Sequence, residues 1–261
     1  MRSMALTDGS SVRATLAPHL PHLRRYARAL TGSQPRGDAY VRHALETLLG
    51  TPEPPASAEP ALDPRLVLFR LFSAVAQDAP VVGPQSLPRG SMQALLLTEV
   101  EGFSADEAAF ILGTPLAGIA DHVQQAKAAI AATIRARVLI IEDEPLIAMH
   151  LEQIVADMGH DVVGMAITHQ DALACARATA PGLVLADIQL ADGSSGLEAA
   201  RDILEGLDIP VIFITAFPER LLTGERPEPT FLVTKPFRPE SIVATIGQAL
   251  LARSFSAEHA A

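Results

Sequence analysis

Residues 138–144, with the sequence VLIIEDE, decide the fold of the second half of this 261-residue chain. The four apolar residues are typical of a buried strand, and three acidic residues follow where that strand ends. Further short apolar runs come later in the chain, separated by helical patterns: residues 162–166, 183–186, 211–215 and 231–234. This alternation predicts an α/β doubly wound, flavodoxin-like domain with five parallel strands.

The predicted domain covers residues 136–252, and residues 253–261 are expected to form a tail. Its weakest element is the fourth helix, residues 218–229, because two prolines and a glycine interrupt it. The last helix is expected over residues 239–252.

Reactive side chains stand at the ends of the first, third, fourth and fifth predicted strands. Each alone is typical of a solvated strand end or a helix cap. Because the carboxyl ends of parallel strands meet at one edge of a sheet, their occurrence in this order indicates a shared crevice. They are Glu142, Asp143, Glu144, Asp187, Thr215 and Lys235.

The chemistry of these residue types indicates phosphoryl transfer. Clustered carboxylates repel one another, and Mg²⁺, which prefers oxygen ligands, would relieve that repulsion. An aspartate at such a metal can attack phosphorus and form an acyl phosphate. A lysine and a threonine hydroxyl can contact the oxygens of the transferred group.

With these residues, the second half resembles the receiver domain of response regulators. The resemblance implies that Asp187 is the phosphoacceptor, that Thr215 is the switch hydroxyl and that Lys235 contacts the phosphoryl group. It further implies a Mg²⁺ site whose ligands are Asp143, Asp187 and the backbone carbonyl of Gln189, assisted through water by Glu142.

The sequence departs from the usual receiver pattern at two places. Glu142 stands where most receivers carry Asp. Leu232 occupies the place of the aromatic switch, three residues before the lysine, with Phe231 one place earlier. Residues 213–224 resemble the atypical receivers of the FATGUY group, so the usual coupling between a threonine and an aromatic residue is expected to differ here.

The first half carries helical patterns and is divided by a Pro-rich linker, residues 51–64. In the helices that follow, Ser104 and Glu107 fit a capping box and Gly113 fits a helix end. Thr114 is expected to be the N-cap of the next helix.

This arrangement resembles extracytoplasmic-function sigma factors. Residues 85–131 resemble the helix-turn-helix of their region 4, and residues 12–50 resemble region 2. Residues 1–131 are therefore expected to form an all-α, sigma-like helical domain.

Charge argues against DNA binding by this domain. The chain has a net charge of −10, all of it in residues 136–261, because residues 1–135 carry 12 basic and 12 acidic side chains. Residues 85–130 contain two basic and five acidic side chains. Because basic residues supply much of the affinity for DNA through phosphate contacts, we expect no direct DNA binding.

Composition also indicates the cellular compartment of the protein. The single cysteine, Cys175, predicts a reducing cytoplasm. No apolar run approaches the roughly 18 to 20 residues that a membrane-spanning helix needs, so we expect no membrane association.

The order of the two halves resembles the PhyR-type regulators of the alphaproteobacterial general stress response. This resemblance implies that a sensor histidine kinase phosphorylates the receiver, and that the sigma-like half then sequesters a NepR-type anti-sigma factor by mimicry, which releases the true sigma factor.

The alternative is a phosphorylation-dependent DNA-binding transcription regulator or sigma factor that uses the helix-turn-helix. We expect no enzyme activity beyond Mg²⁺-dependent phosphorylation of the receiver itself; a hydrolase is disfavoured because Asp187 itself fits as the nucleophile.

Overall fold

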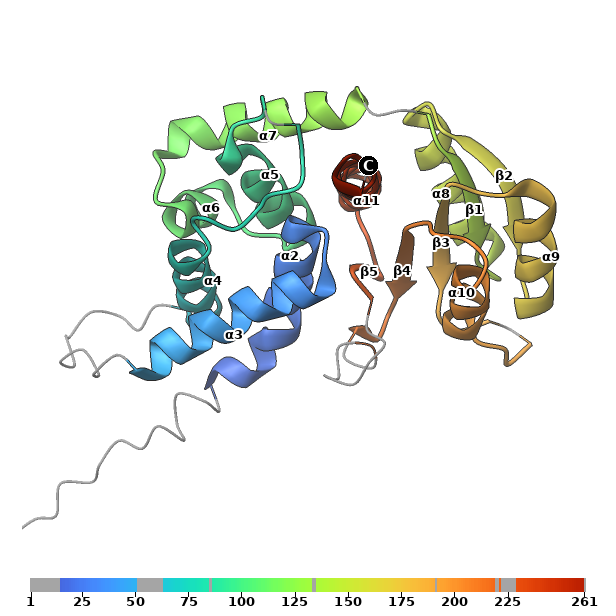
Figure 1. The fold of residues 1–261 in the computed structure, drawn as a ribbon, viewed down its shortest axis with the longest axis horizontal. Coiled ribbons are helices and arrows are strands. Elements are labelled where there is room, and N and C mark those ends of the chain that lie inside the picture. Colours follow the sequence, from blue (N-terminus) through green and yellow to red (C-terminus); the bar gives the residue numbers. More distant parts are fainter. Residues whose placement is uncertain are drawn as a thin grey trace, which may run out of the picture.

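The computed structural model describes residues 15–50, 63–84, 86–132, 135–190, 192–218, 221 and 229–260. Figure 1 shows a helical half and a sheet-containing half, with the last helix, α11, between them. In the described part of the chain, no helix is both long enough and apolar enough to cross a membrane.

Helix α2 of the helical half is capped at its C-terminal end by Gly32, which has the left-handed conformation (φ 61°) that glycine adopts easily. The expected linker lies outside the described residues except for Asp63, which caps α4, and Pro64, the first residue of that helix. The elements of this half are η1 (Ala17–His19), α2 (Leu20–Thr31), α3 (Gln34–Gly50), α4 (Pro64–Val75), α5 (Arg89–Leu95), the π-helical η2 (Leu96–Val100), α6 (Ala105–Leu112) and α7 (Leu116–Ala131).

The helix-turn-helix has the predicted start and end signals. Ser104 and Glu107 form a capping box at α6, and Gly113 ends that helix with φ 66°. The N-cap of α7 is Pro115 rather than Thr114. The backbone N–H of Thr114 instead bonds the carbonyl of Ala109, so Thr114 still belongs to the end of α6.

The second half contains a five-stranded parallel sheet in the order β2-β1-β3-β4-β5, which confirms the predicted doubly wound fold. Most of the interrupted helix expected over residues 218–229 lies outside the described residues. The elements are β1 (Arg137–Ile141), α8 (Pro145–Asp157), β2 (Asp161–Ala166), α9 (His169–Thr179), β3 (Leu183–Asp187), α10 (Gly196–Leu204), β4 (Val211–Thr215), β5 (Phe231–Thr234) and α11 (Pro239–Ala260).

Helix α11 corrects the expected tail, because residues 253–260 continue the helix to Ala260. No glycine or proline follows Ala252 to end it.

Helix α11 also joins the two halves into one core. Its Ile246 is fully buried in a cluster that contains Leu23 and Ile130 of the helical half and Val138 of β1. The Nε2 atom of the buried Gln248 donates a hydrogen bond to the carbonyl of Ala29 at 2.6 Å. The sheet therefore packs on the helical half through α11, and α9 and α10 cover its opposite face (Figure 1).

Within the helical half, Asp38 of α3 accepts two hydrogen bonds of 2.8 Å from the buried Arg28 and two longer ones from Arg24. Burial alone would raise the pKa of Asp38, but the hydrogen bonds from the two arginines hold it below its usual value. The stabilisation that Asp38 provides is therefore present above the unfolded-state pKa of about 3.9 and is lost as the pH falls through the lower, folded-state pKa.

We expect Asp38→Asn to lower the free energy of unfolding by about 1–2 kcal/mol at pH 7, and by less at pH 3, which lies below the unfolded-state pKa of about 3.9. Urea unfolding at both pH values measures this difference. The exposed Asp208, changed to Asn, is the control and should cost little at either pH. An equal loss at both pH values for Asp38→Asn would contradict the assignment.

Candidate functional site

The residues predicted to share a crevice do lie at one edge of the sheet. Asp187 and Thr215 end β3 and β4, while Glu142 and Lys235 directly follow β1 and β5. Since β1, β3, β4 and β5 are consecutive neighbours in the sheet, their carboxyl ends bring these side chains together. Glu142, Asp187 and Thr215 are buried, with 2%, 8% and 3% of their surface exposed.

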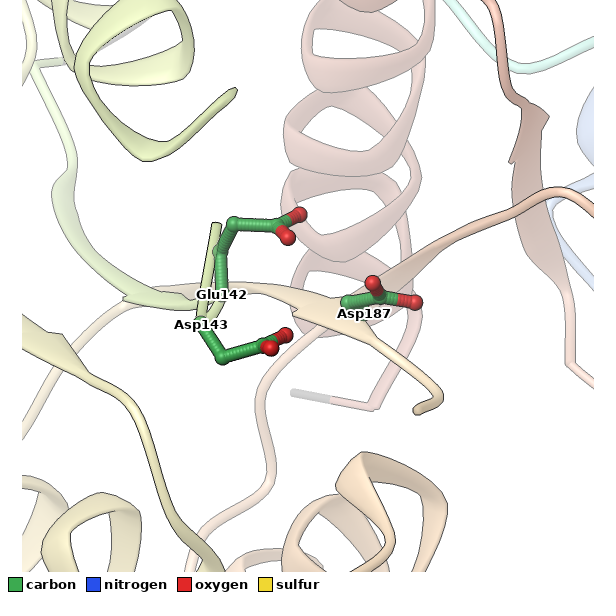
Figure 2. Close-up of side chains that lie close together, drawn as sticks. All are labelled: Glu142, Asp143 and Asp187. Atoms are coloured by element: carbon green, nitrogen blue, oxygen red, sulfur yellow. The ribbon is translucent and has the colours of Figure 1, made fainter. Parts of the chain in front are cut away.

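Three carboxylates of this edge face one another, as Figure 2 shows for Glu142, Asp143 and Asp187. One carboxylate oxygen of each lies within 4.8 Å of those of the other two. Oxygen atoms this close can share one cation, and an all-carboxylate set suits Mg²⁺. The residues present therefore fit a magnesium ion.

Lys235 contributes a positive charge to the same group. Its Nζ donates hydrogen bonds to Asp187 Oδ2 at 2.7 Å and to Glu142 Oε2 and Oε1 at 2.9 and 3.1 Å. Burial alone would lower the pKa of Lys235, but these bonds to Asp187 and Glu142 raise it. Lys235 is therefore a cation at neutral pH and lies in contact with the carboxylate of Asp187.

Glu142 has a pKa raised to about 7, because its burial disfavours the ionised form more than the contact with Lys235 favours it. A cation bound between the carboxylates would favour the ionised form.

The remaining polar groups also contact Asp187 or its neighbours. The backbone N–H groups of Ile188 and Gln189 donate to Asp187 Oδ1 at 2.5 and 3.3 Å. Thr215 Oγ1 accepts a hydrogen bond from the N–H of Phe217 at 3.0 Å, and the carbonyl of Thr215 accepts one from the N–H of Lys235 at 2.7 Å. Thr215 and Lys235 are thus joined through the backbone beside Asp187.

The position usually held by an aromatic switch is packed inside the protein. Leu232 is 1% exposed and belongs to the core on the α9 and α10 side of the sheet. Phe231 is 5% exposed and points to the opposite face, into the core shared with the helical half. Both residues are buried in this structure, and the expected departure from the common coupling stays a prediction.

In α7, the helix that would bind DNA, polar side chains contact other residues of the helical half. His122 Nδ1 lies 3.2 Å from the hydroxyl of the buried Ser91, which donates to Gln125 Oε1 at 2.9 Å. Lys127 Nζ pairs with Glu99 at 2.9 Å. These side chains contact other residues of the helical half, and the absence of direct DNA binding stays an expectation from the charge of this region.

Three buried residues that connect the two halves were not predicted from the sequence: Arg25, Arg28 and Gln248, each at most 6% exposed. The sequence did contain a pattern that predicts burial of the arginines. They alternate on one helix with Leu23, Tyr26 and Leu30, so burial of that apolar face brings at least one guanidinium into the interior.

Comparison with known families covers most of the chain. The sigma2 domain of PhyR matches residues 16–73, the sigma-like domain of the response regulator PhyR matches residues 85–133, and the response regulator receiver domain matches residues 138–247. The phyllosphere-induced regulator PhyR of Methylorubrum extorquens is 48% identical over 255 residues, which cover 92% of this chain and 94% of that protein.

Solved structures give the same result. The response regulator PhyR from Brucella abortus is 51% identical, with a TM-score of 0.85 over 95% of this chain and 98% of that one. The anti-anti-sigma factor PhyR from Bartonella quintana is 46% identical, with a TM-score of 0.83 over 96% of this chain and 100% of that one. A structure of the Bartonella quintana protein in complex with the anti-sigma factor NepR is 48% identical over 92% of this chain and 98% of that one, with a TM-score of 0.41.

Proposed function

The chain belongs to the PhyR family of response regulators, and from this premise we propose that it is a phosphorylation-activated anti-anti-sigma factor. In this proposal a sensor histidine kinase phosphorylates the receiver in the cytoplasm, and the sigma-like half then binds a NepR-type anti-sigma factor. The true sigma factor is released to transcribe stress-response genes. The protein is a regulator, and the only chemistry it promotes is its own phosphorylation.

The observation that best supports the proposal is that the receiver covers part of the sigma-like half. Arg238, close to the start of α11, donates to the carbonyl groups of Thr98 and Glu99, each at 3.0 Å, at the end of η2. Ser241 donates to the same carbonyl of Glu99. A sigma-like surface that the receiver covers in this structure supports binding that phosphorylation controls, because phosphorylation can favour a state in which that surface is exposed.

In the proposed chemistry, a carboxylate oxygen of Asp187 attacks the phosphorus of the donor. A new P–O bond forms, and the bond from phosphorus to the donor breaks with its electron pair leaving on the donor. Lys235 would contact the developing charge, and the hydroxyl of Thr215 would donate a hydrogen bond to a phosphoryl oxygen.

Glu142, Asp143, Asp187 and the carbonyl of Gln189 would hold Mg²⁺, which neutralises phosphoryl charge when it is bound. The carboxylate cluster supports the metal-binding roles of Glu142, Asp143 and Asp187.

Magnesium binding has a direct consequence for stability. Because a ligand that binds only the folded state stabilises it, we expect Mg²⁺ at about 100 times its Kd to raise the free energy of unfolding by about 2.7 kcal/mol. Thermal unfolding with and without Mg²⁺ measures this gain. Asp143→Asn should lose most of it, whereas Asp157→Asn, an exposed change on α8 outside the cluster, should keep it. Full stabilisation of Asp143→Asn by Mg²⁺ would contradict the site.

The alternative function, a DNA-binding regulator or sigma factor, makes the opposite prediction in a paired experiment. The phosphorylated chain is tested for capture of a NepR-type anti-sigma factor and for a shift of promoter DNA at low salt, where DNA binding is strongest. The proposal predicts capture without a shift. A salt-sensitive shift without capture would favour the alternative, which the acidic helix-turn-helix and its internal contacts disfavour.

A further inference from the structure

Two arginines of the sigma-like half hold strand β5 of the receiver. Arg25 Nη1 donates a hydrogen bond to Thr234 Oγ1, at the end of β5, at 3.0 Å. Arg28 Nη1 donates to the carbonyl of Pro229, two residues before the start of β5, at 3.3 Å. Three residues apart on α2, the two side chains point to one side of the helix. We call this pair the arginine clamp.

An acid of the sigma-like half fixes each arginine of the clamp. Arg25 donates through Nε and Nη2 to the two carboxylate oxygens of Glu101, at 2.9 and 2.8 Å. Arg28 donates in the same way to Asp38, at 2.8 Å in both bonds. Bidentate pairs set the orientation of a planar guanidinium group. The Nη1 atoms are therefore held in a fixed direction toward β5. Because they cannot move with the strand, a small shift of β5 breaks their hydrogen bonds.

Thr234 lies one peptide unit from the acidic site. Its neighbour Lys235 contacts Asp187 through Nζ, and the backbone N–H of Lys235 is bonded to the carbonyl of Thr215. A displacement of Lys235 or Thr215 toward a phosphoryl group on Asp187 therefore moves Thr234 as well. These contacts form a continuous path from Asp187 through Lys235 and Thr234 to Arg25.

We propose that the hydrogen bond from Arg25 to Thr234 couples the phosphorylation site to the sigma-like half. It holds β5 against α2 in the unphosphorylated protein and breaks when Lys235 and Thr215 move toward the phosphoryl group. Thr234 is a positioning residue, since it acts through Lys235 and touches no reacting atom. The inference rests on the proposed function, which supplies the phosphoryl group on Asp187.

The test uses Thr234→Val, which removes the hydroxyl and keeps the β-branched shape of a strand residue. The ratio of open to closed molecules is measured in the full chain by energy transfer between dyes on His43→Cys and Ala178→Cys, exposed positions of α3 and α9, in a Cys175→Ser background. Without a phosphodonor, we expect the ratio to rise about tenfold, the equivalent of one hydrogen bond to a charged group.

If the Arg25–Thr234 hydrogen bond couples the two halves, a second result follows that a contact with only a structural role would not give. With acetyl phosphate and Mg²⁺, the gain in the open-to-closed ratio should be about tenfold smaller in Thr234→Val than in the wild type, because the variant has already lost the contact. Thr179→Val is the matched control. It removes a hydroxyl that donates to the Cys175 carbonyl within α9, and it should behave as the wild type.

Two results would overturn the inference: an unchanged ratio in Thr234→Val without phosphodonor, or a gain on phosphorylation as large as that of the wild type. The mass of the intact protein reports phosphate uptake separately. A wild-type chain that takes up no phosphate would refute the proposed function and, with it, the coupling. The ratio without phosphodonor would still show whether the Arg25 contact holds the halves together.

Discussion

Asp187→Ala is expected to reduce acyl-phosphate formation from acetyl phosphate by about 10³-fold or to the detection limit, because it removes the nucleophilic oxygen. Phosphodonor-stimulated capture of an anti-sigma factor should disappear with it. Intact mass and a binding assay measure the two effects. The buried carboxylate of Asp187, 2.7 Å from Lys235, is the geometric reason for this expectation.

The control for this prediction is Asp157→Ala, which removes an exposed acid of α8 from the same domain. It should be phosphorylated as the wild type is. If Asp187→Ala were phosphorylated at the wild-type rate, or if it still responded to the phosphodonor, then the phosphoacceptor would be another residue.

Glu101→Ala is expected to have the largest effect on stability, with a loss of about 3–5 kcal/mol in the free energy of unfolding. The side chain of Glu101 is 0% exposed and pairs with Arg25 at 2.8 Å and with Arg65 at 3.4 Å. Its removal leaves the guanidinium of Arg25, which is 7% exposed, without its carboxylate in the interior. Urea unfolding measures the loss.

Glu205→Ala, an exposed change just after α10, is the matched control and should alter the free energy of unfolding by less than about 0.5 kcal/mol. A loss below about 1 kcal/mol for Glu101→Ala would mean that Arg25 finds another partner or reaches solvent. In that case the fixed orientation of the arginine clamp would no longer hold.

Much of the receiver could be predicted because its signals are local. The run before Glu142 and the run before Asp187 are each apolar along their whole length, as strands buried on both faces must be. The position of a residue at a strand end then places it at the edge where the acidic cluster forms. The roles of all these site residues stay predictions, because they depend on a bound ion and on a phosphoryl group.

The contacts between the two halves could not be predicted, because they depend on partners far apart in the sequence. Arg25 and Thr234 are 209 positions apart, and no local pattern pairs them. The extent of α11 was also misjudged. The apolar pattern fades after Ala252, but a helix continues until a residue ends it, and neither glycine nor proline follows.

The energy needed for the switch is modest. Changing the ratio of closed to open molecules from 99:1 to 1:99 requires about 5.5 kcal/mol of differential stabilisation. Phosphorylation replaces the single negative charge of the Asp187 carboxylate with a phosphoryl group that carries about −1.5 to −2 units of charge, next to Lys235. Loss of a few charged hydrogen bonds across the interface, each worth about 1.5–3 kcal/mol, is of the required size.

The equilibrium Kd of the full chain for a NepR-type anti-sigma factor, with and without acetyl phosphate and Mg²⁺, tests the central claim most directly. We expect binding to tighten by about 100-fold on phosphorylation, because the receiver then no longer covers the sigma-like surface. An equal Kd in both states, with phosphate uptake verified by intact mass, would contradict the claim that the receiver gates the sigma-like half.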